Sequence, residues 1–129
     1  MASFPLLAII VAAYTLLALV APGWLEMAQF HLPLLSGLPL PFRGGDLLLV
    51  IGLILLCVEV YRATSSSASA ILNHVLSLVV FIIALIELLV MPPMANMTFF
   101  LIVAMTLIDV IAGFTVTISS ARRDVQYPS

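Results

Sequence analysis

Four long apolar stretches fill most of the sequence, and they constrain the fold more than any other feature. They run from about Phe4 to Ala21, Asp46 to Tyr61, Ala70 to Val90 and Met97 to Ser119. An α-helix needs roughly 20 apolar residues to cross a hydrocarbon layer of about 30 Å. The pattern predicts an all-α fold: an integral membrane four-helix bundle that forms one domain over residues 1–129.

Composition supports a lipid environment for these helices. Of the 129 residues, 64% are hydrophobic and only 8% are charged, and the mean hydropathy is +1.34. A soluble domain of this size has too high a surface-to-volume ratio to bury so much apolar surface. We therefore expect the outer surfaces of these helices to contact the lipid bilayer, which is the main predicted partner of the protein. The net charge of −2 and the lack of a basic stretch argue against nucleic acid as a partner.

The connections between the stretches differ in character. Residues 63–69 and 91–96 are short, so the helices that they join should be antiparallel neighbours. Asp46 and Asn96 are the expected N-caps of the second and fourth helices. Residues 23–45 are too apolar for a free loop and too rich in proline for a straight helix. This first loop is predicted to lie in the membrane interface, with a re-entrant hairpin as the alternative.

Arginine placement predicts the orientation. With four spans, the second loop and the C-terminal tail share one side, which carries Arg62, Arg122 and Arg123, whereas the other side carries only Arg43. The positive-inside rule then places both termini in the cytoplasm. The first stretch lacks the basic n-region of a secretory signal, so we expect it to be a retained span.

Asp109, about halfway along the fourth stretch, is the most informative single residue. A carboxylate at mid-bilayer costs about 2.5–3.5 kcal/mol, so Asp109 should be neutral or hydrogen-bonded inside the bundle. Spacings of three and four place it on one helix face with Thr106, Gly113 and Thr117. It is either a proton- or ion-binding site or a carboxyl group bonded to a neighbouring helix.

A similar polar stripe in the third stretch contains Asn73, Ser77 and Glu87, which suggests that the third and fourth helices pack through polar faces. Glu87 is close enough to the helix end to reach interfacial water. Tyr14 lies at a depth comparable with that of Asp109, and its hydroxyl is a candidate partner for that carboxyl.

Glu59 and Arg62 are three residues apart, a spacing that predicts an ion pair on one helix face. His74 follows the short second loop at a similar depth, so a contact between Glu59 and His74 is possible. Because histidine titrates near neutral pH, this contact would also suit a proton relay.

No catalytic, cofactor-binding or metal-ligating residues are predicted, and no cofactor is expected. The sequence contains no H-E-x-x-H, C-x-x-C, G-x-S-x-G or glycine-rich phosphate loop. Cys57 is the only cysteine, so an internal disulfide is impossible and a packing role is expected.

Two segments carry a family resemblance. GDLLLVIGLILLCVEVYRAT (Gly45 to Thr64) resembles the second span, and NMTFFLIVAMTLIDVIAGFTVTISSARRD (Asn96 to Asp124) the last span, of small four-span proteobacterial inner-membrane proteins of unassigned function. The resemblance covers roughly half of the chain. It implies a multi-pass protein of the bacterial inner (plasma) membrane and implies no activity.

Two functional hypotheses arise from these features. The first is a non-enzymatic structural or accessory subunit of a larger inner-membrane complex, with a membrane-protein partner, because the few polar residues suffice as helix–helix contacts. The second is a small proton-linked channel or transporter that uses Asp109, Glu87, Glu59 and His74 and works as a homo-oligomer. A membrane enzyme is a distant third, because no nucleophile–base pair has suitable spacing.

Overall fold

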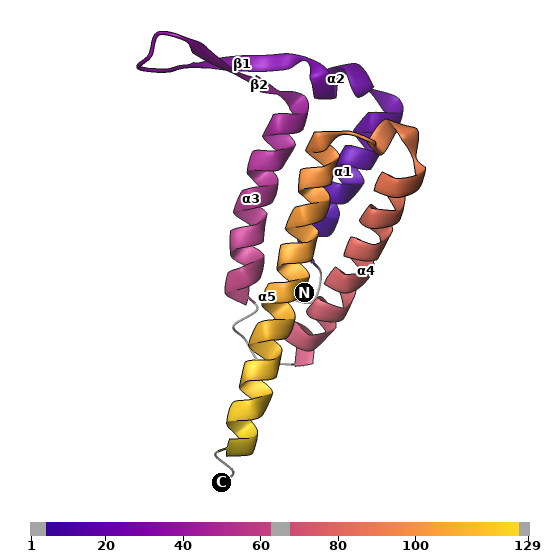
Figure 1. The fold of residues 1–129 in the computed structure, drawn as a ribbon, viewed down its shortest axis with the longest axis vertical. Coiled ribbons are helices and arrows are strands. Elements are labelled where there is room, and N and C mark those ends of the chain that lie inside the picture. The colour runs from indigo at the N-terminus through magenta and orange to yellow at the C-terminus, as the bar shows by residue number, and fades with distance from the viewer. Residues whose placement is uncertain (1–4, 63–67, 127–129) are drawn as a thin grey trace.

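The computed structural model describes the backbone of residues 5–62 and 68–126, and the side chains of residues 5–62 and 71–115. The elements in chain order are α1 (Leu7–Val20), α2 (Pro22–Glu26), β1 (Ala28–Pro33), β2 (Pro39–Arg43), α3 (Gly44–Arg62), α4 (Ala68–Val90), η1 (Pro92–Met94) and α5 (Met97–Gln126). The long helices α1, α3, α4 and α5 run side by side, and α5 packs against the other three (Figure 1).

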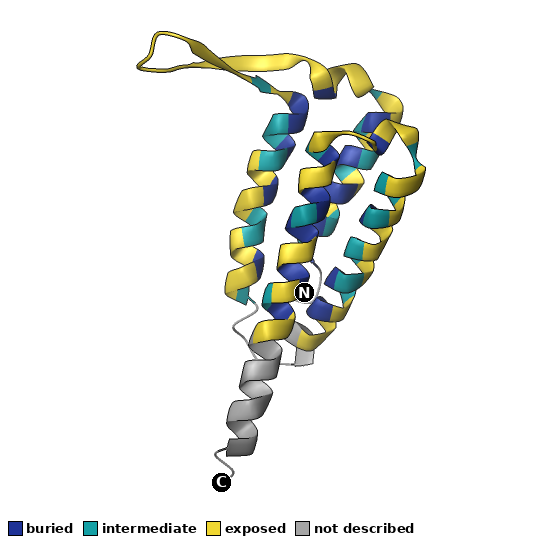
Figure 2. Ribbon diagram, in the orientation of Figure 1, coloured by how far each residue is buried: buried dark blue, intermediate teal, exposed yellow. Residues whose placement is uncertain are grey.

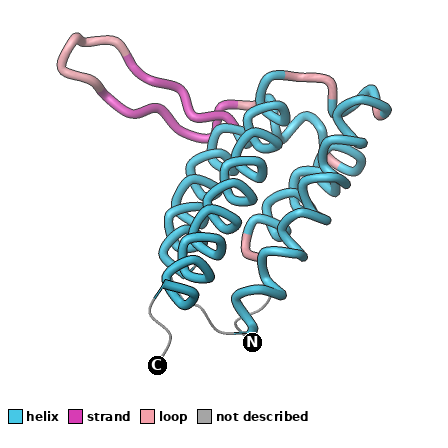
Figure 3. The backbone as a smooth tube through the Cα atoms, turned by 60° about the horizontal axis from the view of Figure 1, so that its bottom comes forward, coloured by secondary structure: helices cyan, strands magenta, loops and turns pink. Residues whose placement is uncertain are grey.

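The two ends of this bundle differ. We call the end where α1 begins and α5 ends the terminal end (Figure 3), and the end that carries β1 and β2 the hairpin end. The helices alternate in direction along the chain, so the short connections join antiparallel neighbours as predicted.

Local sequence explains where the helices begin and end. Pro22 cannot continue α1 and instead occupies the first position of α2. Asn96 caps α5 as predicted, because its side-chain oxygen accepts a hydrogen bond from Phe99 N at 2.8 Å. Asp46, predicted as the N-cap of α3, lies inside the first turn, since α3 begins at Gly44, and its carboxylate accepts a bond from Arg43 N at 3.1 Å.

Three helical segments of the described chain are long and apolar enough to cross a membrane: Gly44–Arg62, Ile71–Val90 and Met97–Thr115. The fourth helix, α1, is equally apolar in character but has only 14 residues. At 1.5 Å per residue it is about 21 Å long, which is short of the hydrocarbon thickness.

Apolar side chains fill most of the interior of the bundle and also cover its outer surface, and a few polar side chains are buried among the helices. Large apolar residues lie on the outside of every long helix, while polar residues with exposures of 5% or less lie between the helices (Figure 2). The buried polar residues are Glu59, Asn73, His74, Ser77, Thr106 and Asp109. Cys57 is exposed on α3 and does not have the packing role expected for it.

The chain is mostly helical, as predicted, but the first loop adds a small sheet to the fold. β1 and β2 form an antiparallel pair, in which Phe30 and Phe42 stack with ring centroids 4.7 Å apart. Gly37 has a φ of 90° in the connecting turn, a conformation that glycine adopts without strain. The hairpin stands away from the bundle and does not run back between the helices (Figure 1).

Candidate functional site

Five polar side chains from three helices meet near the terminal end of the bundle. We call this group the buried polar cluster: Glu59 on α3, Asn73, His74 and Ser77 on α4, and Asp109 on α5. Each is 5% exposed or less. Because these residues come from three helices, the cluster exists only when α3, α4 and α5 are packed together.

Glu59 is the hub of the cluster and is 1% exposed. One carboxylate oxygen, Oε1, accepts a hydrogen bond from Leu6 N at 2.6 Å and an ion-pair contact from Arg62 Nη1 at 3.4 Å. The other, Oε2, accepts a bond from Asn73 Nδ2 at 3.2 Å. The N–H groups at the start of a helix have no acceptor within the helix, and Glu59 on α3 supplies one at the start of α1. Its negative charge also interacts favourably with the positive end of the α1 dipole.

The second carboxyl group of the cluster, that of Asp109, lies beside the first. The side chains of Glu59 and Ser77 are both within hydrogen-bonding reach of it. Two adjacent carboxyl groups cannot both be ionised without a large repulsive cost, so this pair is suited to sharing a proton. Ser77 also donates a hydrogen bond to Asn73 O at 2.9 Å, which ties it to the first turns of α4.

His74 fills a notch in α5 that Gly113 creates. A Cβ atom on Gly113 would lie 2.6 Å from His74 Nδ1 and 3.0 Å from Cγ and Cε1, so only glycine accommodates the imidazole at this distance. The predicted pairing of His74 with Glu59 is not a hydrogen bond, although Glu59 is among the charges that act on His74. Among the described side chains, His74 Nε2 and Asn73 Oδ1 are buried without a hydrogen-bond partner.

The structure brings only some of the predicted residues together. Asp109, Glu59, His74 and Gly113 converge, and the Glu59–Arg62 ion pair is confirmed. Thr106 is buried one turn from Asp109, but its hydroxyl donates to Val103 O at 2.6 Å. The side chain of Thr117 lies outside the described residues.

Two predicted placements were wrong. Tyr14 does not meet Asp109: its hydroxyl donates to Asn96 Oδ1 at 3.0 Å, at the hairpin end. Glu87 does not join a polar interface between α4 and α5, because its Oε1 accepts a bond at 2.9 Å from Thr15 on α1. In both cases depth was inferred from position along the helix, whereas the rotation of each helix decides which neighbour a side chain faces.

The roles of Asn73 and Leu6 were not anticipated. The sequence places Asn73 on a polar stripe of the third stretch, and the spacing gives no reason to pair it with Glu59, from which it is separated by 14 positions. Leu6 contributes through its backbone N–H, for which an apolar side chain gives no signal. The start of the first apolar stretch near a buried carboxylate could have suggested such a cap.

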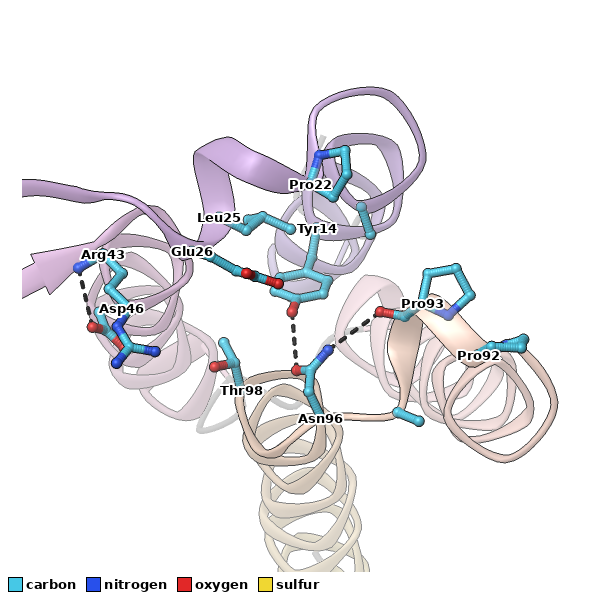
Figure 4. Close-up of a pocket in the computed structure, with 12 residues that line it drawn as sticks. Tyr14, Pro22, Leu25, Glu26, Arg43, Asp46, Pro92, Pro93, Asn96 and Thr98 are labelled. Atoms are coloured by element: carbon cyan, nitrogen blue, oxygen red, sulfur yellow. Dashed lines mark hydrogen bonds between the residues drawn. The ribbon is translucent and has the colours of Figure 1, made fainter.

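A second polar region lies at the hairpin end. It is a pocket of about 530 Å³ whose polar lining residues are Tyr14, Glu26, Arg43, Asp46, Asn96 and Thr98 (Figure 4). Asn96 and Asp109 are separated by 13 positions of one helix, or about 20 Å. The buried α5 residues between the two regions include Phe99, Ile102, Val103 and Met105, so an apolar layer separates the pocket from the buried polar cluster.

Neither region has the composition of a metal site. Within the described residues, no three His, Cys, Asp or Glu side chains are placed to hold a metal ion. Comparison with known proteins adds no assignment: no family model, curated protein or solved structure matches the chain.

Proposed function

We propose that this chain is a non-enzymatic integral membrane protein that acts as a structural or accessory subunit of a larger bacterial inner-membrane complex. The observation that carries the proposal is the β1–β2 hairpin. Every residue from Glu26 to Pro41 is exposed, and the tip residues Leu35 and Leu38 are 109% and 69% exposed. An apolar projection of this kind normally marks a surface that another molecule covers.

The position of the hairpin favours a protein as the covering molecule. It leaves the bundle where α3, a helix of membrane-spanning length, begins, and it extends to one side of the helices (Figures 1 and 3). A two-stranded sheet has two open edges, and unpaired backbone groups are poorly tolerated in hydrocarbon. A neighbouring membrane protein can supply both an apolar contact and partners for these edges.

The test is gentle extraction of the tagged full-length chain from its native membrane, followed by mass measurement of the intact assembly. We expect the wild-type chain to leave the membrane with a partner in fixed stoichiometry. Leu35→Glu should release that partner, because the substitution places a charge in the apolar contact. Ser36→Glu, which adds the same charge at the neighbouring position, is the matched control and should retain it. Recovery of the wild-type chain alone, or an equal effect of both variants, would count against the proposal.

A second function, proton-linked transport by an oligomer of this chain, is favoured by one observation: the adjacent carboxyl groups of Glu59 and Asp109. Intramembrane ionisable residues commonly mark proton pathways. The apolar layer between the cluster and the hairpin-end pocket weighs against this function for the single bundle, since the described side chains form no continuous polar route.

Proton flux into liposomes that contain the purified chain and a pH-sensitive dye tests this second function. If it holds, wild-type vesicles equilibrate pH and Asp109→Asn abolishes the flux, because the amide cannot exchange a proton. Glu87→Gln removes a carboxyl outside the cluster and should leave the flux intact. Flux that is absent from wild-type vesicles, or unchanged by Asp109→Asn, excludes the relay.

A further inference from the structure

The pocket at the hairpin end has a lining that suggests a specific class of ligand. Its walls come from α1, α2, the end of β2, and the first turns of α3 and α5, with η1 at the rim. Tyr14 lies at its base, where the ring packs against Phe99 with centroids 5.2 Å apart and the hydroxyl bonds Asn96. The pocket is therefore bounded by the apolar core on the side of Tyr14.

The charges around this pocket have both signs. Arg43 supplies a guanidinium, and Glu26 and Asp46 supply carboxylates (Figure 4). The backbone N–H of Arg43 bonds Asp46, but no ion pair links the three side chains within the described part of the chain. A pocket with one cationic and two anionic groups that do not neutralise one another suits a ligand that carries both charges.

The level of the pocket along the helices restricts the class of ligand further. Arg43 and Asp46 flank the start of the membrane-spanning segment Gly44–Arg62, and Thr98 lies in the first turn of the segment Met97–Thr115. Residues 92–96 connect the segment that ends at Val90 to the one that begins at Met97. The pocket is thus at the level where spans meet the polar surface, which is the level of phospholipid headgroups.

We propose that this pocket binds the headgroup of a phospholipid that carries a primary ammonium and a phosphate, as in phosphatidylethanolamine. Arg43 binds the phosphate, because a guanidinium pairs with phosphate oxygens through a planar set of donors. Glu26 and Asp46 accept hydrogen bonds from the ammonium, and Asn96 and Thr98 supply neutral polar contacts. A volume of about 530 Å³ is in the range of small-molecule sites. In this proposal only the headgroup occupies the pocket, and the acyl chains lie in the bilayer.

The chain contains its own reporter for this site. Trp24 is the only tryptophan, and it lies on α2 two residues before Glu26. Its indole packs so closely on Gly44 that a Cβ atom there would overlap the ring and the Trp24 carbonyl. A ligand that draws Glu26 and Arg43 together changes the surroundings of this indole, and Trp24 fluorescence measures that change.

The experiment is a fluorescence titration of the full-length chain in nonionic detergent micelles. The added probes are phosphatidylethanolamine, phosphatidylcholine and phosphatidylglycerol with identical acyl chains, and free phosphoethanolamine. We expect Trp24 fluorescence to change saturably with phosphatidylethanolamine. Phosphatidylcholine, whose headgroup has no N–H donors, and phosphatidylglycerol, which has no ammonium, should each bind at least tenfold more weakly. Free phosphoethanolamine should bind more weakly than the lipid, because it lacks the acyl chains.

Variants test the assigned contacts. Arg43→Gln, Glu26→Gln and Asp46→Asn should each weaken phosphatidylethanolamine binding about tenfold, the loss expected for one charge-assisted hydrogen bond. Asp46→Asn preserves the bond to Arg43 N, since asparagine is also a good acceptor at helix starts. Glu87→Gln, outside the pocket, should bind normally. Equal binding of all three lipids, or of every variant, overturns the proposal, and tighter binding of free phosphoethanolamine overturns the lipid as the source of the headgroup.

Discussion

Glu59→Ala is expected to destabilise the bundle by about 3–5 kcal/mol, the usual cost of removing one member of a buried charged network. The substitution leaves Leu6 N and Asn73 Nδ2 without their acceptor and removes the ion pair between Glu59 and Arg62. It also removes the only carboxylate that caps α1 in the described structure. Unfolding in mixed micelles by increasing dodecyl sulfate, followed by Trp24 fluorescence and circular dichroism, measures the change.

Glu59→Gln is the matched control for this prediction. The amide keeps one oxygen for Leu6 N, while its NH₂ group would face the NH₂ group of Asn73. Asn73 Oδ1 has no partner among the described residues, so a flip of the Asn73 amide turns that clash into a hydrogen bond. We expect a loss of about 1 kcal/mol, the net contribution of a single hydrogen bond. Equal losses in the two variants would show that the charge, and not the bonding pattern, stabilises the bundle.

Gly113→Ala should destabilise the packing of α4 on α5 by about 1–3 kcal/mol, the range for overpacking a filled site. The new Cβ atom would lie 2.6 Å from His74 Nδ1 and 3.0 Å from His74 Cγ. Because Cγ is the ring atom bonded to Cβ, the imidazole cannot move aside as the end of a long flexible side chain can. The intrinsic gain of alanine over glycine in a helix, about 1 kcal/mol, is included in this range and opposes the loss. The same unfolding titration measures the effect.

Gly52→Ala is the control for Gly113→Ala, because it makes the same change in helix propensity without a rigid steric clash. A Cβ atom on Gly52 would lie 2.7 Å from Met105 Cε, which is the end of a flexible side chain and can move. This variant should therefore be neutral or slightly more stable than the wild type. A further check is Gly113→Ala combined with His74→Ala: loss of the imidazole should cancel most of the penalty, as a double-mutant cycle would show. If Gly113→Ala is as stable as Gly52→Ala, the notch has no role in packing.

The long helices could be predicted from the sequence because long, uninterrupted apolar segments are easy to recognise. The predicted second and third stretches agree with α3 and α4 to within two residues at each end. The short helix α1 and the hairpin were harder. Strand pairing between residues 28–33 and 39–43 depends on a turn at Gly37 and on aromatic stacking across the sheet, and three prolines hide the alternation that usually marks strands.

Some residues of the buried polar cluster could also be predicted from the sequence. A buried carboxylate must have partners, so Asp109 and Glu59 could be singled out from composition and depth alone. Which partners they find depends on how each helix is rotated, and a helix with apolar residues on all sides carries little information on rotation. The partners of Tyr14 and Glu87, which are Asn96 and Thr15, therefore could not be read from spacing.

The apolar layer around Phe99 and Ile102, both fully buried, also has an electrical consequence. Moving a hydrated charge into such a medium costs many times the thermal energy, so the bundle is an insulator at mid-depth. If the helices span a membrane as we propose, a single bundle with such a layer is expected not to dissipate the membrane potential. In that arrangement, a charge that reaches Asp109 would enter and leave by the same face of the bilayer, unless α1 or α5 first shifts relative to its neighbours.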